Sequence, residues 1–431
     1  DGFQTSTPVG PPVATPGALT PANGAMFVVT TSSSDGFVTK LDPDGAIVYS
    51  TYLGGSGSDS PAAIATASDG SVYVAGTTYS RDFPVTPGVY ATSFTSTTYA
   101  YSNFIAKLRA DGSLAWSSFF ANGNTTILSI AVDAQDNPVI AGSTSGQLPV
   151  TPGAYQTTFQ RAQFCGFFCM PGPTSAFVTK FKSDGTGLVY STYVAFDSAN
   201  ALVQDAQSIA LDGDGRVYIA GTGRLVLLDA SGSALLAATS RANVTFNALA
   251  LDAEGNVYGA GSVALSPYTD PFPATDGAFQ KEPRPGTPSL PLQPYPGGGS
   301  DAIVMKWDAA LSRVQAATLL GGESYDSASS VAIGRSGEVI VSGTTDSKSF
   351  PTSSPFQTSF SPRSGFVAAF DPNLSTLRYS TYLGDRRPFE ARLAIADRNG
   401  DLLVAGSMLT AGSLFLANDP DHGGGHLPDY C

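Results

Sequence analysis

The stretch that decides the fold is AAIATASDGSVYVAGTTYS, residues 62–80, which is followed after an insertion by NFIAKLRADGSLAWSSFF, residues 103–120. Each piece predicts two strands around an Asp-Gly pair, a strong hairpin signal because glycine adopts positive φ without strain. We name the four expected strands A, B, C and D in chain order. This unit recurs along the chain, so the protein is built from one repeated supersecondary element.

The repeats divide the chain into seven units after an extended, Pro-rich segment at residues 1–17. The first unit depends on ALTPANGAMFVVTT (18–31), which aligns without gaps with residues 64–77 as an A–B hairpin. A count of six stays open, because PVATPGAL (12–19) resembles the string found in the insertions, and one blade would then be closed by both termini. The seven units of residues 18–431 are 18–55, 62–121, 128–195, 207–240, 246–322, 328–385 and 391–431.

Composition and strand pattern together predict an all-β fold, a single propeller of four-stranded antiparallel blades. The 431 residues include 47 Gly, 30 Pro and only 13% charged residues, and no window shows a helical period. In RVYIAGT, Val217 and Ile219 point to one side while Tyr218 and Ala220 point to the other, so both faces are apolar. Sheets buried on both faces pack radially as blades. A glycine allows close backbone approach at the end of each strand B: Gly76, Gly142, Gly221, Gly261, Gly343 and Gly406.

A resemblance to a known family rests on LGGSGSDS (53–60), AIATASDGSVYVAGTTYSRDFPVTPGVYATSF (63–94) and FIAKL (104–108). These motifs resemble the bacterial SBBP repeat. The resemblance implies a seven-bladed β-propeller in an extracellular or surface protein, with no assigned catalytic residues and no known ligand. The unit at 207–240 departs from the pattern by lacking the Pro-rich string, and the last unit lacks a clear strand D.

Long insertions between strands B and C are expected on one face of the propeller. They span residues 79–102, 145–175, 264–300 and 346–364, and they carry the strings FPVTPGVYATSF, LPVTPGAYQTTF, FPATDGAFQ and FPTSSPFQTSF. Two interpretations are open: the insertions fold down as a lid or latch between blades, or they contact a ligand directly. Candidate contacts of the second kind are Phe83, Tyr90, Tyr155 and Phe279.

The loops between strand D and the next strand A are expected on the same face. They contribute the carboxylates of Asp59, Asp197, Asp205, Glu323 and Asp326. Such carboxylates could hold calcium or accept hydrogen bonds from a glycan, and solvated loop carboxylates are the ordinary alternative. LDPDG (41–45) and LDGDG (211–215) lack the spacing of a calcium loop and predict hairpin turns.

Cysteine and histidine give little indication of chemistry. Cys165 and Cys169 are spaced for a local disulfide, with two unpaired thiols as the alternative, and Cys431 has no evident partner. His422 and His426 are separated by three glycines, where no helix would align them for a metal. Without a G-x-S-x-G elbow or central histidines, we expect no enzyme and no cofactor beyond the calcium just considered.

Charge and hydropathy restrict the partners. The net charge of −13 and the absence of a basic run argue against nucleic acid. No apolar run approaches the ~18 residues of a membrane-spanning helix, so no membrane insertion is expected. Few charges and many hydroxyls fit a secreted or cell-surface protein, and we expect any signal peptide to have been removed before Asp1.

Two functions of different classes follow. The first is an interaction or scaffold module that binds a protein or glycan through the inserted loops. The second is a structural protein that assembles with copies of itself, because GFQTSTPV (2–9) resembles PFQTSFSP (355–362) and could add as a strand to an open blade, within the chain or on a neighbour. A propeller lyase or hydrolase is the third alternative.

Overall fold

The computed structural model consists of β-strands and the loops that join them. The described residues include no helix long and apolar enough to cross a membrane. Every pairing between named strands is antiparallel. The structure describes residues 35–42, 46–94, 100–159, 174–194, 205–265, 271–284, 299–361, 363–384, 389–396 and 402–408.

The strands alternate with turns in the order that the repeats predict. In chain order they are β1 (Gly36–Leu41), β2 (Ile47–Leu53), β3 (Asp59–Thr66), β4 (Val72–Thr78), β5 (Ser102–Leu108), β6 (Leu114–Asn122), β7 (Thr125–Val132), β8 (Pro138–Thr144), β9 (Ser175–Phe181), β10 (Leu188–Tyr193), β11 (Ser208–Leu211), β12 (Val217–Leu228), β13 (Leu235–Leu251), β14 (Val257–Ala264), β15 (Ser300–Trp307), β16 (Val314–Leu320), β17 (Asp326–Ile333), β18 (Val339–Thr345), β19 (Ser364–Phe370), β20 (Leu377–Leu383), β21 (Phe389–Ala396) and β22 (Leu402–Met408).

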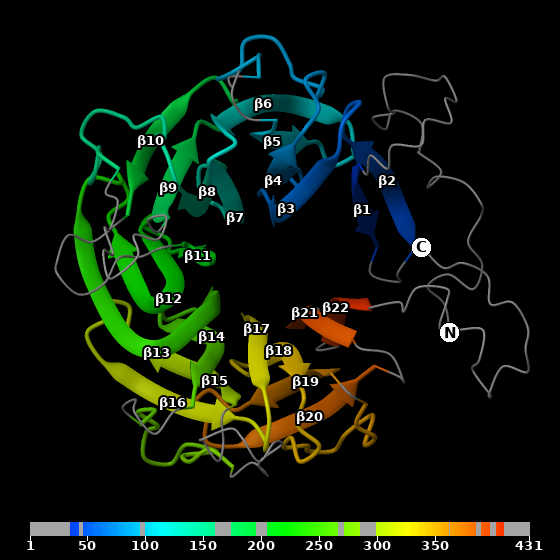
Figure 1. Cartoon of the computed structure of the whole chain (residues 1–431), viewed down its shortest axis with the longest axis vertical. Helices are drawn as coiled ribbons and strands as arrows, with labels where there is room; N and C mark the ends of the chain where they lie inside the picture. The colour runs from blue at the N-terminus through cyan, green and yellow to red at the C-terminus, as the bar shows by residue number, and fades with distance from the viewer. Residues whose placement is uncertain are drawn as a thin grey trace, which may run out of the picture.

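Three four-stranded sheets reproduce the predicted unit of strands A to D. Their orders are β3-β4-β5-β6, β10-β9-β8-β7 and β17-β18-β19-β20, so neighbours in sequence are neighbours in the sheet. Two of their A–B turns hold a glycine in the left-handed region, with φ +77° at Gly70 and +81° at Gly337, and the β7–β8 turn holds Asp136 there at +60°. Figure 1 shows the sheets around a common centre, with β3, β7, β11 and β17 nearest to it and β6, β10, β16 and β20 outside.

A six-stranded sheet takes the place of two separate blades. Strand β12 pairs with β11 through residues 217–220 and with β13 through 224–228, so its halves correspond to strands B and C. Strand β13 pairs with β12 through 235–240 and with β14 through 244–251, so it joins strand D to the next strand A. The fourth unit lacks the long insertion, and strand B therefore passes into strand C at Gly223, whose φ is +71°.

Two further sheets contain only half a unit each. β1 and β2 form a C–D hairpin, and β21 and β22 form an A–B hairpin. The A–B hairpin expected at 18–31 and the strand C expected at 413–424 lie outside the described residues. The described strands therefore make five complete units and two halves. The all-β architecture is confirmed, and the predicted count of seven blades is not.

Neighbouring blades pack face to face through large apolar side chains. Phe104 and Ile105 are adjacent on β5, and both are fully buried. Phe104 belongs to the cluster that contains Val38 and Tyr49 of β1 and β2, whereas Ile105 belongs to the cluster that contains Phe177 of the following blade. The prediction that both faces of a middle strand are buried is confirmed, and it places the core between the blades.

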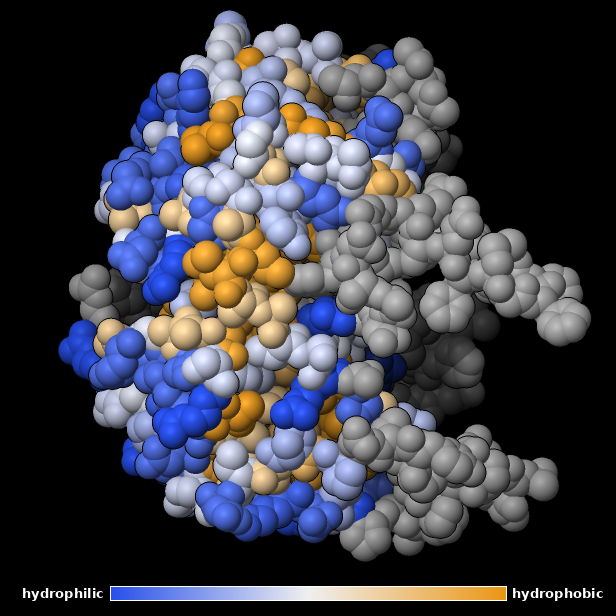
Figure 2. Space-filling view, turned by 90° about the vertical axis from the view of Figure 1, so that its left-hand side faces the viewer, coloured by the Kyte–Doolittle hydropathy of each residue, from blue (hydrophilic) through white to orange (hydrophobic). Residues whose placement is uncertain are grey.

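The outer wall of the ring is largely polar. Figure 2 shows hydrophilic residues over much of it, with hydrophobic residues between them. Among the latter, Val189 of β10 and Leu236 of β13 are exposed by 47% and 50%. Exposed apolar side chains of this kind are ordinary on protein surfaces. The wall therefore gives no argument for a binding site.

Candidate functional site

The recurring string forms a strap across the outer edge of its own blade. In the first copy the Thr86 amide donates to the Ser117 carbonyl at 3.1 Å, and the Phe119 amide donates to the Ala91 carbonyl at 3.0 Å. Both partners lie on β6, the strand D of that blade. Phe83 begins the string and is buried, with its ring centroid 4.5 Å from that of the phenylalanine on β5. A side chain so enclosed has little surface to offer a ligand.

The end of the strap reaches the following blade. In three copies the amide of an aromatic residue donates to a carbonyl of the next C–D turn: Tyr90 to Gly185 at 2.8 Å, Tyr155 to Gly232 at 2.8 Å, and Phe279 to Leu374 at 3.0 Å. The rings of Tyr90 and Phe279 each lie 5.8 Å, between centroids, from a phenylalanine of the next blade. These contacts favour the latch interpretation of the string. Contact of the same residues with a ligand stays a prediction.

The D–A loops and the first residues of the B–C insertions lie together on one face, which we call the loop face. The Tyr79 amide donates to the Ser58 carbonyl at 2.9 Å, and the Asp346 amide donates to the Tyr325 carbonyl at 2.8 Å. Each bond joins the end of a strand B to the preceding D–A loop. The expectation that both kinds of loop share a face is thus met in the structure.

A pair of buried carboxylates lies beneath the loop face where β15 and β17 begin. Asp326 is 1% exposed, and its Oδ2 accepts hydrogen bonds from the Gly322 amide and the Ser347 hydroxyl, both at 2.8 Å. Asp301 is fully buried, and neither of its carboxylate oxygens has a hydrogen-bond partner; the same holds for Oδ1 of Asp326. Burial and the nearby Asp326 carboxylate raise the pKa of Asp301 to about 7, and burial raises the pKa of Asp326 to about 6.

A related pair lies at the junction of β1 and β3, where Asp59 is buried and Asp35 is partly buried. Asp59 is 3% exposed, and its Oδ2 accepts hydrogen bonds from the Gly55 amide at 2.8 Å and the Ser80 hydroxyl at 2.6 Å. Its Oδ1 has no hydrogen-bond partner. A Cβ built on Gly54 would lie 2.8 Å from both Asp35 Oδ1 and Asp59 Oδ2, so the two carboxylates approach one point. Burial raises the pKa of Asp35, and the Asp59 carboxylate raises it further.

Each pair has a third carboxylate nearby, which accepts a hydrogen bond from a serine of the neighbouring loop. We call the β1/β3 junction the first and the β15/β17 junction the second. At the first junction the Ser56 hydroxyl donates to Asp82 Oδ1 at 2.8 Å. At the second junction the D–A loop supplies the acid, since the Ser349 hydroxyl donates to Glu323 Oε2. The D–A loop supplies the serine at the first junction and the carboxylate at the second, and the B–C insertion supplies the other partner in each case. The hydrogen bond between the two loops is therefore present at both junctions.

Exposed tyrosines border these loops. Tyr79 is exposed by 49%, and its ring centroid lies 5.3 Å from that of Tyr101. Tyr325, beside the second pair, is exposed by 59%. The sequence analysis identified neither these tyrosines nor Asp35 and Asp301. The available signal was the Asp that precedes strand C in SSDGFVTKL (33–41) and GGSDAIVMKW (298–307).

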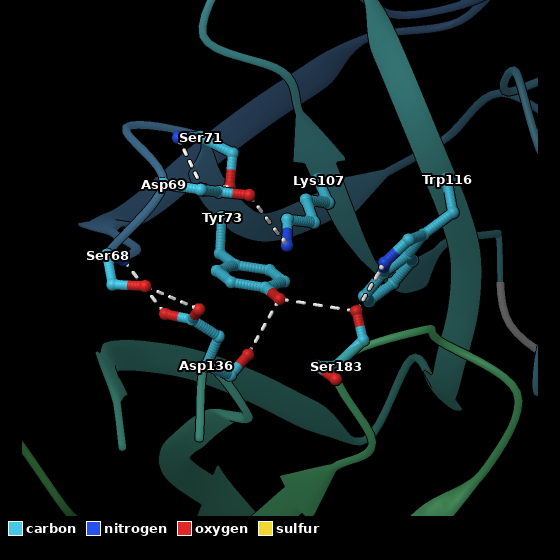
Figure 3. A network of polar contacts seen from close by, with 8 residues as sticks. All are labelled: Ser68, Asp69, Ser71, Tyr73, Lys107, Trp116, Asp136 and Ser183. Carbon is cyan, nitrogen blue, oxygen red and sulfur yellow. Dashed lines mark hydrogen bonds and ion pairs between the residues drawn. The ribbon is translucent and has the colours of Figure 1, made fainter. Parts of the chain in front are cut away.

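A different polar network holds the blades together on the opposite face, where the A–B and C–D turns lie (Figure 3). The Tyr73 hydroxyl donates to the Asp136 carbonyl at 2.8 Å and the Ser183 carbonyl at 3.3 Å, and Trp116 Nε1 donates to the latter at 2.9 Å. Lys107 forms an ion pair with Asp69 at 3.7 Å. The tyrosine and tryptophan bonds run from one blade to turns of the next, so we assign this network to blade packing.

The remaining predicted residues are placed as follows. The carboxylate of Asp205 accepts hydrogen bonds from the Gln207 side chain at 2.7 Å and from a β12 amide at 3.2 Å. The Asp212 carboxylate accepts a hydrogen bond from the Arg216 amide at 2.9 Å, across the turn of its own hairpin. This contact confirms the interpretation of LDGDG as a hairpin turn. Within the described ranges no group of three or more His, Cys, Asp or Glu could hold a metal ion. Outside the described residues lie Asp197, Cys165, Cys169, His422, His426 and Cys431.

Among the comparisons with known proteins, the family model supports the propeller repeat. No curated protein matches the chain. Among solved structures, the chain is similar to a protein of unknown function from Bacteroides caccae, with 8% identity and a TM-score of 0.40 over 82% of this chain and 100% of that one. The model of a family described as SBBP, beta-propeller repeat, matches residues 48–84, which span strand D, a complete A–B hairpin and the start of the strap. The resemblance found in the sequence is confirmed there, and the chain carries the SBBP β-propeller repeat.

Proposed function

We propose that this chain is a non-catalytic, secreted or cell-surface interaction module that binds a glycan or a protein through its loop face. The observation that carries the proposal is the gathering of exposed tyrosines and carboxylates there. Tyr79 and Tyr101 stand together at one junction, and Tyr325 stands beside Glu323 at the other. Tyrosine offers a flat apolar surface with a polar tip, and carboxylates accept hydrogen bonds from hydroxyl groups.

The straps support the same assignment. They cover the outer edges of the blades, and Tyr90, Tyr155 and Phe279 anchor them to C–D turns of the next blade. A rigid scaffold that presents a few side chains from loops is a common design for recognition. Beneath the loops, the carboxylates of Asp59 and Asp326 accept hydrogen bonds from backbone amides and serine hydroxyls, which supports a structural role for these two over acid–base catalysis.

The test is binding to an array of bacterial and host glycans, followed by titration of any glycan class that binds. The double variant Tyr79→Ala/Tyr325→Ala should weaken binding at least tenfold. Leu236→Ala removes an equally exposed side chain from the outer wall and should leave binding unchanged. Equal loss in both variants would contradict a role for the loop face, and so would catalytic turnover of the bound glycan.

Self-assembly is the second candidate, favoured by the two half-unit sheets, whose outer strands are unpaired among the described residues. The strand proposed for exchange, residues 2–9, lies outside those residues. Sedimentation of the full chain and of a chain lacking residues 1–10 tests the idea. Assemblies that dissolve on truncation, with monomers as stable as before, would favour exchange between molecules.

A further inference from the structure

We propose that each carboxylate pair beneath the loop face holds a divalent cation of the calcium type. Three unsatisfied oxygens belong to the pair at β15 and β17, namely both oxygens of Asp301 and Oδ1 of Asp326. Oδ1 of Asp59 repeats the pattern at the other junction. Buried polar atoms almost always have partners, so four such oxygens at two equivalent places indicate a missing ligand.

Charge identifies the kind of ligand. When both are ionised, Asp301 and Asp326 place two negative charges out of water, which is costly unless opposite charge neutralises them. Burial raises the pKa of Asp301 and the positive charge of Arg284 opposes that rise, but the Arg284 guanidinium donates its hydrogen bond to the Ser349 carbonyl, at 2.6 Å, and not to the carboxylate. Calcium accepts carboxylate oxygens in flexible geometry, whereas magnesium demands a regular octahedron and retains several waters. A site this enclosed therefore suits calcium better.

The two acids occur together or not at all at the described junctions. Where strand C begins with Asp35 or Asp301, the next strand A begins with an aspartate, Asp59 or Asp326. At the following junctions the equivalent positions hold Ser102 with Thr125 and Ser364 with Phe389. If each aspartate only shaped its own loop, the two positions would vary independently of each other. If both bind one ligand, loss of the ligand removes the need for both acids, as the described junctions show.

Calorimetric titration of the chelator-treated full chain with calcium tests the proposal. The wild type should bind two equivalents, Asp301→Asn one, and Asp301→Asn/Asp59→Asn none. Asp276→Asn, at an exposed ion pair with Lys281, should still bind two. Absence of calcium binding by the wild type overturns the proposal, as does binding that Asp276→Asn reduces as much as Asp301→Asn does. A rise in melting temperature with calcium, absent in the double variant, provides the second readout.

A separate observation concerns the two half units, and from it we infer that β22 pairs with β1 to close a ring of six blades. In each strand B one glycine packs against the carbonyl of the facing strand A, where a Cβ would lie well under 3.0 Å from that oxygen. The glycines are Gly76, Gly142, Gly221, Gly261, Gly343 and Gly406. Residues 18–31, aligned with 64–77, place Thr30 at this position. Their sequence thus lacks the glycine that every described strand B has, and β22 is the only described strand B without a C–D partner.

The register of the other blades fits this pairing. Gly76, Gly142 and Gly343 lie opposite Phe104, Phe177 and Phe366, all fully buried. The same register places Gly406 opposite Phe37, which is exposed by 63%. The fourth strap points to the same closure, because Phe356 is exposed by 86% and has no next-blade turn like those that receive Tyr90 and its equivalents. In a ring closed between β22 and β1, the C–D hairpin of the blade that follows this strap's own blade is β1–β2.

Cysteine cross-linking tests the closure in a chain whose native cysteines are replaced by serine. Val38→Cys with Ala405→Cys should form an intrachain disulfide in the monomer, because these residues match the paired Ala75 and Ile105 of a complete blade. Val38→Cys with Ser407→Cys, two residues out of register, should not. A disulfide found only between molecules would show that a second copy supplies the edge, and equal reactivity of both pairs would show no defined register. Either result overturns the inference.

Discussion

Replacing Asp301 by asparagine should stabilise the cation-free protein at neutral and alkaline pH. The raised pKa of Asp301 means that the unfolded chain loses this proton near pH 3.8, whereas the folded chain keeps it until about pH 7. Below pH 3.8 the carboxyl is protonated in both states, so it imposes no cost. As pH rises from about 4 to about 7, the unfolded state is increasingly favoured, and above that window the full cost is present.

The magnitude follows from the width of that window. A difference from 3.8 to about 7 corresponds to about 4 kcal/mol, at 1.36 kcal/mol per pKa unit. Asparagine removes the charge and keeps the shape, but its amide needs partners, and an unsatisfied buried group costs about 1–3 kcal/mol. The neighbouring Oδ1 of Asp326 is available as one acceptor. We therefore expect a net gain of about 1–3 kcal/mol at pH 8 and a net loss of about 1–3 kcal/mol at pH 4, where only the cost of the amide remains.

Urea unfolding in the presence of a chelator, at pH 4, 6 and 8, measures this profile for the wild type, Asp301→Asn and Asp276→Asn. The exposed Asp276 control should follow the wild type, and Asp301→Asn should lose less stability between pH 4 and pH 8. An unchanged slope in Asp301→Asn would refute the assignment of a costly buried charge. With calcium added, the order should invert, because the wild type then gains the binding energy of its second site.

Two further predictions concern the blades and their straps. Gly343→Ala should cost about 3 kcal/mol, because its Cβ would collide with a β17 carbonyl, whereas Gly213→Ala, with open space around it, should change stability by less than about 0.5 kcal/mol; chemical denaturation checks both. Tyr90→Ala should cost about 2–3 kcal/mol by removing the strap's contact with Phe181, and Tyr325→Ala, on the exposed loop, should cost little. If the Tyr90 variant is as stable as the Tyr325 variant, the strap does not hold the blades together.

The local parts of this structure could be predicted because they depend on neighbouring residues. The hairpin at Gly70 is encoded by an Asp-Gly pair between β-rich runs, and burial of both strand faces follows from the apolar residues around Ile219. The destination of the strap could not be predicted, since the carbonyl that receives Tyr90 lies 95 positions later, at Gly185. Asp301 was missed because its role depends on a partner from the next blade.

The seven-unit count depended on the gap-free alignment of residues 18–31 with 64–77 and on the match of 413–424 to a strand C, and the structure does not confirm it. Residues 18–31 carry the spacing of an A–B hairpin, but Thr30 occupies the position where every described strand B has glycine. The requirement for glycine comes from a bulge in strand A, as between Pro61 and Ala63, which brings a carbonyl against strand B. The glycine itself could be recognised in the sequence, but the bulge and the carbonyl that require it could be seen only in the structure.

The central proposal is that one unit, repeated six times and closed on itself, accounts for the described strands. Its most direct test is the cost of Phe37→Ala measured beside that of Phe104→Ala. In a closed ring both phenylalanines are buried opposite a glycine of strand B, and each substitution should cost about 3–5 kcal/mol. If the β1 edge is open, Phe37 keeps its 63% exposure and its loss should cost less than about 1 kcal/mol, which would contradict the account.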